Sequence, residues 1–254
     1  MKRLATLLYG TLAYVVFLAT FLYAIGFLGN MVVPKALDSG TTGPLTTALA
    51  VDLGLLTLFA LQHSGMARRG FKRWITRFVP DGAERSTYVL ASSLALLLLF
   101  VAWRPLGGVV WQVDNTIGQV GLYAGFAFGW LLVLVTTFVI NHFDLFGLRQ
   151  SWREFRGETQ QPLPFVTPLL YRIVRHPLYV GWFFAFWSTP TMTVTHLLFA
   201  AMATGYILVA IQLEERDLMA AHPEYARYRQ QVPMLIPGTT RTTGASTGVR
   251  PVGA

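Results

Sequence analysis

Two groups of charged and aromatic side chains in the last third of the chain have the residue types that binding and catalysis need. The first group is Arg175, His176 and Tyr179, and the second is Glu214, Glu215, Tyr225, Arg227 and Tyr228. Such a set offers guanidinium groups for a carboxylate, carboxylates for hydroxyl and ammonium groups, and aromatic rings for a flat base or a cation. The two groups therefore predict the halves of one polar binding site.

Two histidines elsewhere in the chain are candidates for proton transfer, because an imidazole titrates near neutral pH. His142 stands two residues before Asp144, a carboxylate that is placed to orient it. His63 ends an apolar segment. A structural role stays open for both: His63 as a bonded residue at a helix end, and His142 as a solvated residue at a helix cap.

One apolar run separates the two polar groups, and its length decides how they meet. As a single helix, residues 178–213 would be about 54 Å long at ~1.5 Å per residue, whereas a bilayer core is ~30 Å thick. The sequence Ser188-Thr189-Pro190 interrupts this run with a proline, which lacks a backbone donor and clashes with the preceding turn. We expect a helical hairpin that returns Glu214 to the side of the membrane where Arg175 lies.

The composition places this site in a membrane protein. Of the 254 residues 54% are hydrophobic and 13% are charged, and the mean hydropathy is +0.49. We expect an all-α integral membrane protein with five to six transmembrane segments and a cytosolic C-terminal cofactor site. The predicted segments cover residues 4–29, 45–62, 87–103, 118–140, 178–190 and 193–213, of which the last two form the hairpin.

The net charge of +8 is explained by topology rather than by nucleic-acid binding. With the N-terminus in the cytosol, all 20 lysines and arginines except Lys35 and Arg104 fall on the cytosolic side, as the positive-inside rule requires. The basic, amphipathic segment 67–78 is expected to lie on the membrane lipids of that leaflet. We expect the protein in a membrane, the bacterial inner membrane, with its active site facing the cytosol.

Several classes of site are excluded by the sequence pattern. The chain has no cysteine, so thiolate metal sites, catalytic cysteines and disulfides are excluded. No Gly-rich loop follows a strand and no H-E-x-x-H motif is present, which excludes a Rossmann-type methyltransferase fold and this class of zinc site. Gly121, Gly125 and Gly129 stand in an apolar segment, so they indicate close helix packing instead.

Two features of the predicted spans have a structural and a functional interpretation. Asp52 is a carboxylate inside the second span, and it is either functional or bonded within the bundle, with three threonines nearby. Trp103 and Trp111 fit an aromatic belt at the outer membrane surface.

The C-terminal third resembles the isoprenylcysteine carboxyl methyltransferase superfamily, whose members are integral membrane enzymes that use S-adenosylmethionine. The superfamily signature RHPxYxG matches residues 175–181, and the acidic pair Glu214 and Glu215 follows the apolar hairpin. The later matching positions are Tyr225, Tyr228, Pro233 and Pro237. Upstream, the stretches QHSGMARRGFKRW, ERSTYVLASSLALLLL and NHFDLFGLRQ are similar to the bacterial branch that includes methanethiol S-methyltransferases and NnrU proteins.

This resemblance implies an S-adenosylmethionine-dependent methyltransferase whose acceptor is a small thiol, with methanethiol converted to dimethyl sulfide. It assigns the cofactor to Arg175, His176, Tyr179, Glu214, Glu215, Tyr225, Arg227 and Tyr228, and no metal is expected. A thiol must lose its proton before it attacks, so we expect His142 to be the base, oriented by Asp144, with His63 as the second candidate.

Two alternatives stay open: an NnrU-like accessory membrane protein of nitrogen-oxide metabolism, and an isoprenylcysteine carboxyl O-methyltransferase. We expect residues 1–237 to form a single domain, in which about 141–237 bind the cofactor, and 238–254 to form a disordered tail. The linker 148–167 contains Pro162 and Pro164 and is expected to form a lid over the RHP motif.

Overall fold

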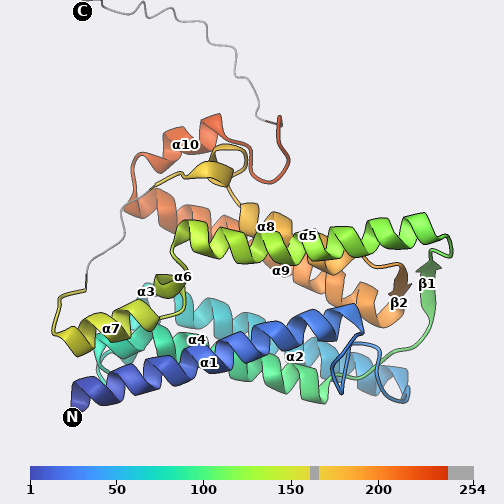
Figure 1. The fold of residues 1–254 in the computed structure, drawn as a ribbon, viewed down its shortest axis with the longest axis horizontal. Helices are drawn as coiled ribbons and strands as arrows, with labels where there is room; N and C mark the ends of the chain where they lie inside the picture. The colour runs from blue at the N-terminus through green and yellow to red at the C-terminus, as the bar shows by residue number, and fades with distance from the viewer. Residues whose placement is uncertain (161–165, 240–254) are drawn as a thin grey trace, which may run out of the picture.

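The computed structural model describes residues 1–160 and 166–239 and shows two layers of helices (Figure 1). One layer holds α1 (Lys2–Gly29), α2 (Leu45–Ala67) and α4 (Asp81–Ala102). The other layer holds α5 (Thr116–Ile140), α8 (Pro177–Trp187) and α9 (Val194–Ala221). The shorter elements are α3 (Arg69–Ile75), β1 (Val109–Gln112), α6 (His142–Leu145), α7 (Leu148–Arg156), the 3-10 helix η1 (Leu169–Arg172), β2 (Thr191–Thr193) and α10 (Tyr225–Gln231). Pro162 and Pro164 of the predicted lid, and all but the first two residues of the predicted tail, lie outside the described residues.

Within the described part of the chain, five helices are long and apolar enough to cross a membrane, namely α1, α2, α4, α5 and α9. This agrees with the predicted multi-pass membrane protein and with the lower of the two expected segment numbers. The predicted segment 178–190 corresponds to α8, which has 11 residues and is therefore about 16 Å long. A helix of that length does not cross a ~30 Å bilayer core.

Glycines of α5 let α8 pack closely against it, as their spacing predicted. A Cβ atom at Gly129 would lie 2.5 Å from the backbone nitrogen of Ala185, and one at Gly181 would lie 2.9 Å from the carbonyl oxygen of Gly129. A Cβ at Gly125 would lie 2.8 Å from Oγ of Ser188, the residue directly after α8. A Cβ at Gly121 would meet nothing within 4 Å. The packing prediction is confirmed for Gly125 and Gly129 and is wrong for Gly121, which faces open space.

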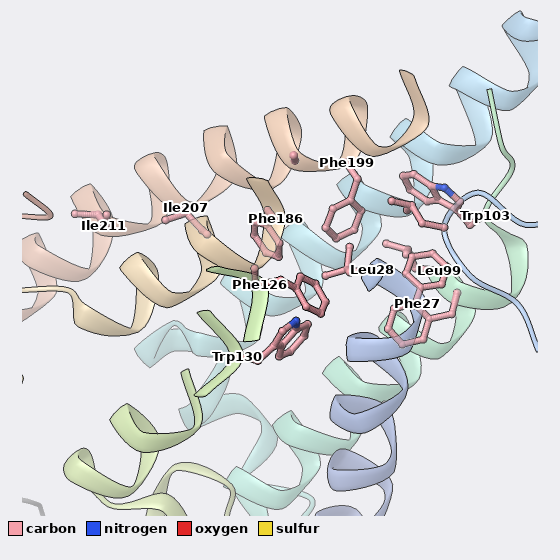
Figure 2. Close-up of a cluster of buried hydrophobic side chains, with 14 residues drawn as sticks. Phe27, Leu28, Leu99, Trp103, Phe126, Trp130, Phe186, Phe199, Ile207 and Ile211 are labelled. Carbon is pink, nitrogen blue, oxygen red and sulfur yellow. The ribbon is translucent and has the colours of Figure 1, made fainter. Parts of the chain in front are cut away.

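Aromatic side chains from both layers fill the hydrophobic core (Figure 2). Trp103 contacts both Phe27 of α1 and Phe199 of α9, and Phe126 and Trp130 of α5 lie beside them. Trp103 is only 1% exposed, so its assignment to an outer aromatic belt is wrong. Its ring packs edge-on against Phe27 and Phe199, because the loop after α4 turns into the bundle at this point.

A two-stranded antiparallel sheet, which the sequence did not predict, joins the two long connections at one end of the molecule (right in Figure 1). Val109 pairs with Thr193 and Gln112 with Thr191. The chain before α9 is tied to the same place, because the amide of Val194 donates to the carbonyl of Gly108 at 3.2 Å. The sheet therefore fixes the positions at which α5 and α9 begin.

Asp52 has a structural role at this end of the molecule. Its side chain is fully buried, and Oδ1 accepts a 2.9 Å hydrogen bond from the backbone nitrogen of Arg104. The carboxylate thus holds the backbone at Arg104, two residues after the end of α4. This observation supports the interpretation of Asp52 as a residue bonded within the bundle.

At the opposite end, α7 docks against α1 and α4 through one buried serine. Ser151 Oγ donates to the carbonyl of Gly82 at 2.9 Å and lies 3.2 Å from Ser86 Oγ. Gly10 leaves the space that this side chain needs, because a Cβ there would lie 2.1 Å from Ser151 Oγ. The N-terminus of α1 and the helices α3, α6, α7 and α10 gather at this end (left in Figure 1).

Candidate active site

Glu215 of α9 lies at the centre of a buried cluster of charged side chains. Its carboxylate is 2% exposed, and Oε1 accepts a 2.7 Å hydrogen bond from Arg175 Nε. His176 Nε2 lies 3.1 Å and Tyr225 OH 3.3 Å from the same oxygen. Arg229 Nε lies 3.0 Å from Oε2. The two polar groups of the sequence are therefore in contact, and two guanidinium groups compensate the charge of Glu215.

Arg175 also holds the chain that follows α10. Its Nη1 donates to the carbonyl oxygens of Arg229 at 3.0 Å and Val232 at 2.5 Å. Its backbone nitrogen donates to the carbonyl of Pro233 at 2.8 Å. Because one arginine joins a buried carboxylate to three backbone carbonyls, the start of α8 and the segment after α10 form one rigid unit.

Glu214, the other member of the acidic pair, has a different environment. Its side chain is 47% exposed and accepts a 2.9 Å hydrogen bond from Tyr179 OH. His176 Nδ1 lies 3.9 Å from Glu214 Oε2, so the imidazole stands between the two carboxylates. Glu215 is buried with its Oε1 hydrogen-bonded within the protein, whereas Glu214 has a side chain that a ligand can reach.

The tyrosines of α10 are structural donors. Tyr225 is 2% exposed beside Glu215, and Tyr228 OH donates to the carbonyl of Tyr171 at 2.6 Å. Burial raises the pKa of Tyr228 to about 12 and also raises the pKa of Tyr225, so both phenols keep their protons near neutral pH. They hold α10 against η1 and α9.

The arginine of α10 that contacts Glu215 is Arg229, which was not among the predicted site residues. Arg227 is exposed on α10. Arg229 follows Tyr225 by four residues, and residues separated by four lie on the same face of a helix. Because Tyr225 is buried against Glu215, this spacing would have identified Arg229 from the sequence.

His142 is buried among side chains of α1 and α5. It is 4% exposed, with Tyr14 OH 2.9 Å from Nε2 and Thr137 Oγ1 2.8 Å from Nδ1. The ring of Phe138 stacks on it at a centroid distance of 4.2 Å. The interpretation of His142 as a solvated residue at a helix cap is therefore wrong. Burial lowers the pKa of His142, which favours the neutral ring.

Asp144 does not orient His142 in this structure. Both ring nitrogens of His142 face other residues, and Asp144 Oδ2 accepts a 3.0 Å hydrogen bond from Arg149 Nη1. Asp144 is itself 6% exposed. The structure thus brings Asp144 to α7 rather than to the imidazole.

His63 lies in a second polar cluster, between α2 and α4. Tyr88 OH is 2.9 Å from its Nε2 and 3.1 Å from its Nδ1, and Ser92 Oγ is 3.2 Å from Nδ1. One residue further along α2, Ser64 Oγ lies 3.0 Å from the hydroxyl of Tyr206 on α9. Tyr88, Ser92 and Tyr206 were not predicted as site residues from the sequence.

The two polar clusters are neighbours. Tyr179, whose hydroxyl bonds Glu214, lies within electrostatic range of both Tyr88 and Tyr206. His63 therefore lies on the side of the bundle to which Tyr179 and Glu214 also belong. Among the residues that the structure describes, no group of three or more histidine and acidic side chains is arranged to hold a metal ion.

Comparison with known proteins identifies similar sequences over almost the whole chain. A methanethiol S-methyltransferase of Crocosphaera subtropica is 59% identical over 238 residues, which are 93% of this chain and 93% of that protein. One of Mycobacterium tuberculosis is 54% identical over 244 residues, 96% of this chain and 100% of its own length. Nurim of Sus scrofa is 34% identical over 179 residues, 67% of this chain and 68% of that protein. No family model matches the chain. No solved structure matches it either.

Proposed function

This chain belongs to the methanethiol S-methyltransferase family, and on that basis we propose that it transfers a methyl group to methanethiol and releases dimethyl sulfide. Relatives that are more than half identical and cover over nine tenths of the chain carry this activity in their names. The resemblance predicted from the sequence motifs is thereby confirmed. The same relatives favour a thiol acceptor over the two alternatives, an accessory protein of nitrogen-oxide metabolism and a prenylcysteine carboxyl methyltransferase.

The proposed methyl donor is S-adenosylmethionine, which supplies a methyl group bound to a positively charged sulfur. The residues around Glu214 fit the polar groups of this molecule. The accessible carboxylate of Glu214 suits hydroxyl or ammonium donors, and the partly exposed Tyr179 offers an aromatic face. The exposed Arg227 is available for a carboxylate. The observation that carries this proposal is that the acidic pair is divided into a compensated Glu215 and an accessible Glu214.

The remaining residues of the predicted site then have supporting roles. Arg175, His176 and Tyr225 surround Glu215 and hold the site in one geometry. Tyr228 ties α10 to η1 from behind. We assign these four residues to positioning, and Glu214, Tyr179 and Arg227 to direct contact with the cofactor.

The proposed orientation places this site in the cytosol. It lies at the end of the bundle with the N-terminus, α3 and α7, where most basic residues of the described chain are found, while Lys35 and Arg104 belong to the opposite end. In this arrangement α8 and α9 are the predicted hairpin, in which α8 enters the membrane without crossing it. The break after Trp187 reverses the chain.

The test combines product detection with direct binding. Cells that express the chain and receive methanethiol are expected to release dimethyl sulfide, measured by headspace gas chromatography. Isothermal titration of the detergent-purified protein is expected to show S-adenosylmethionine binding that Glu214→Gln weakens at least about tenfold, or ~1.4 kcal/mol. Asp217→Asn removes an exposed carboxylate from the same helix and is expected to leave the affinity unchanged.

Two results would contradict the proposal. Equal affinity of the wild type and Glu214→Gln would remove Glu214 from the cofactor site. Methylation of a prenylcysteine but not of methanethiol by the purified wild type would show that the acceptor is wrong.

A further inference from the structure

A polar cluster lies between α2, α4 and α9, three of the helices that are long and apolar enough to cross a membrane. Its contacts named above join these helices to one another and do not involve Glu214 or Glu215. It contains His63, Tyr88 and Ser92, with Ser64 and Tyr206 beside them. Polar and ionisable side chains inside a membrane span are costly, and they commonly mark substrate or proton pathways. Five polar side chains gather here in otherwise apolar helices, which indicates a function beyond helix packing.

A second histidine and tyrosine pair in the same molecule shows what a structural pair looks like. Tyr14 and His142 lie 2.9 Å apart, the same distance as Tyr88 and His63. His142 is 4% exposed and stacked under Phe138, so no ligand reaches its ring. His63 and Tyr88, by contrast, keep accessible surface although they lie between helices.

This accessible surface is connected to the proposed cofactor site through Tyr179. Tyr88 and Tyr206 lie within electrostatic range of Tyr179, whose hydroxyl bonds Glu214. Phe59 stacks on His63 at a centroid distance of 5.1 Å, so one face of the imidazole is covered by an apolar ring. The surroundings of His63 therefore suit a small ligand with an apolar group and one weakly acidic proton.

We propose that the acceptor thiol binds against His63, that His63 removes its proton, and that Tyr88, whose hydroxyl lies close to both ring nitrogens, positions the imidazole. This inference rests on the proposed function and adds the acceptor site and the base. The thiol breaks its sulfur–hydrogen bond, and the proton goes to a ring nitrogen of His63. The sulfur electron pair forms the new bond to the methyl carbon, and the electron pair of the broken donor bond stays on the donor sulfur.

The ionisable groups around His63 come from three helices. Arg85 and Tyr88 belong to α4, and Arg85 lies within electrostatic range of the ring. Tyr179 belongs to α8 and Tyr206 to α9. Glu84 of α4 acts electrostatically on Tyr88, whereas the charged group that acts on the imidazole is Arg85. His63 is therefore the group assigned to accept the proton of a neutral thiol.

The experiment compares two acceptors of nearly the same size. Methanethiol is mostly protonated at neutral pH, whereas methaneselenol is mostly ionised and needs no base. His63→Gln is expected to lower kcat/KM for methanethiol about a hundredfold, the usual contribution of a general base. The same variant is expected to retain methaneselenol methylation within about threefold, and calorimetry is expected to show unchanged S-adenosylmethionine affinity.

Further variants separate positioning from structure. Tyr88→Phe is expected to lower kcat for methanethiol and to shift the acidic limb of the pH profile, whereas Tyr14→Phe, the matched change in the buried pair, is expected to leave that profile unchanged. An equal loss with methanethiol and methaneselenol in His63→Gln would overturn the assignment, and so would full methanethiol activity in that variant. Failure of the wild type to bind S-adenosylmethionine would contradict the proposed function instead, and would be seen before any variant is made.

Discussion

At the scale of single residues, the main finding is that two adjacent glutamates have opposite environments. Glu215 is buried between two arginines and a histidine, while nearly half of the Glu214 side chain is exposed. Neighbouring positions on a helix point about 100° apart, so one turn of α9 buries one carboxylate and leaves the other accessible. Stability and binding are therefore separable at this pair.

The first prediction concerns stability at the pair. Glu215→Ala is expected to lower the free energy of unfolding by roughly 3–5 kcal/mol, because it leaves a buried guanidinium unpaired. Glu214→Ala is expected to cost less than about 1 kcal/mol, because that side chain is largely solvated. Thermal unfolding of both variants in the same detergent measures the difference, and similar midpoints would contradict the assigned burial.

The second prediction concerns His142 and pH. Burial lowers the pKa of His142 in the folded state, so between the unfolded value of about 6.5 and the lower folded value the unfolded chain binds more protons. Stability is then lost as the pH falls below about 6.5, and it is unaffected by this group at higher pH. The melting temperature of wild type is expected to fall more steeply than that of His142→Asn between pH 7 and 5. Parallel curves would show that the ring is not buried in solution.

The site residues were predictable from the sequence where their order in the chain carried the information. Arg175, His176 and Glu215 were selected by spacing and lie together. His142 was ranked above His63 because Asp144 is close in the chain, yet Asp144 bonds Arg149 in space. Whether a histidine side chain is buried or accessible depends on aromatic side chains of other helices. The spacing of residues along the sequence does not contain that information.

At the scale of elements, the close approach of α5 and α8 fixes the position of α8, which begins directly after His176. The third prediction is that Gly129→Ala destabilises the protein by about 1–3 kcal/mol, because its Cβ would lie 2.5 Å from the backbone of α8. Gly121→Ala on the same helix is the control, since nothing lies within 4 Å of its Cβ position. Thermal unfolding and the yield of monodisperse protein measure both effects. A stable Gly129→Ala variant would show that the helices lie further apart.

The long helices were predictable because a run of apolar residues has few alternatives in a membrane, whereas their boundaries and the sheet were not. The predicted second span stopped at residue 62, but α2 continues to Ala67, and Ser64 in the added turn contacts Tyr206 of α9. The strand Val109–Gln112 has four residues, and its partner lies about 80 residues away. Pairing over that separation is a property of the assembled bundle and leaves no local pattern.

At the scale of the whole molecule, the fold separates a basic end from an end with little charge. The fourth prediction tests this orientation in the membrane, using the absence of cysteine from the chain. Gly43→Cys and Gly70→Cys are matched variants, because both glycines are exposed with nothing within 4 Å of the Cβ position and they lie at opposite ends of α2. A membrane-impermeant maleimide added to intact cells is expected to label Gly43→Cys only. Labelling of Gly70→Cys before lysis would reverse the proposed topology.

The hold of Arg175 on the chain after α10 has a consequence for biosynthesis. The carbonyls that receive its guanidinium and amide belong to Arg229, Val232 and Pro233, which leave the ribosome more than fifty residues after Arg175 itself. Before these residues are synthesised, Glu215 lacks its ion pair with Arg229, and Arg175 lacks its three backbone carbonyl acceptors. Translation that stops before this point leaves Arg175 paired with Glu215 but without its backbone acceptors, and we expect such a chain to open locally and to be exposed to proteases. We therefore expect the order of this charged cluster to depend on a late event in synthesis.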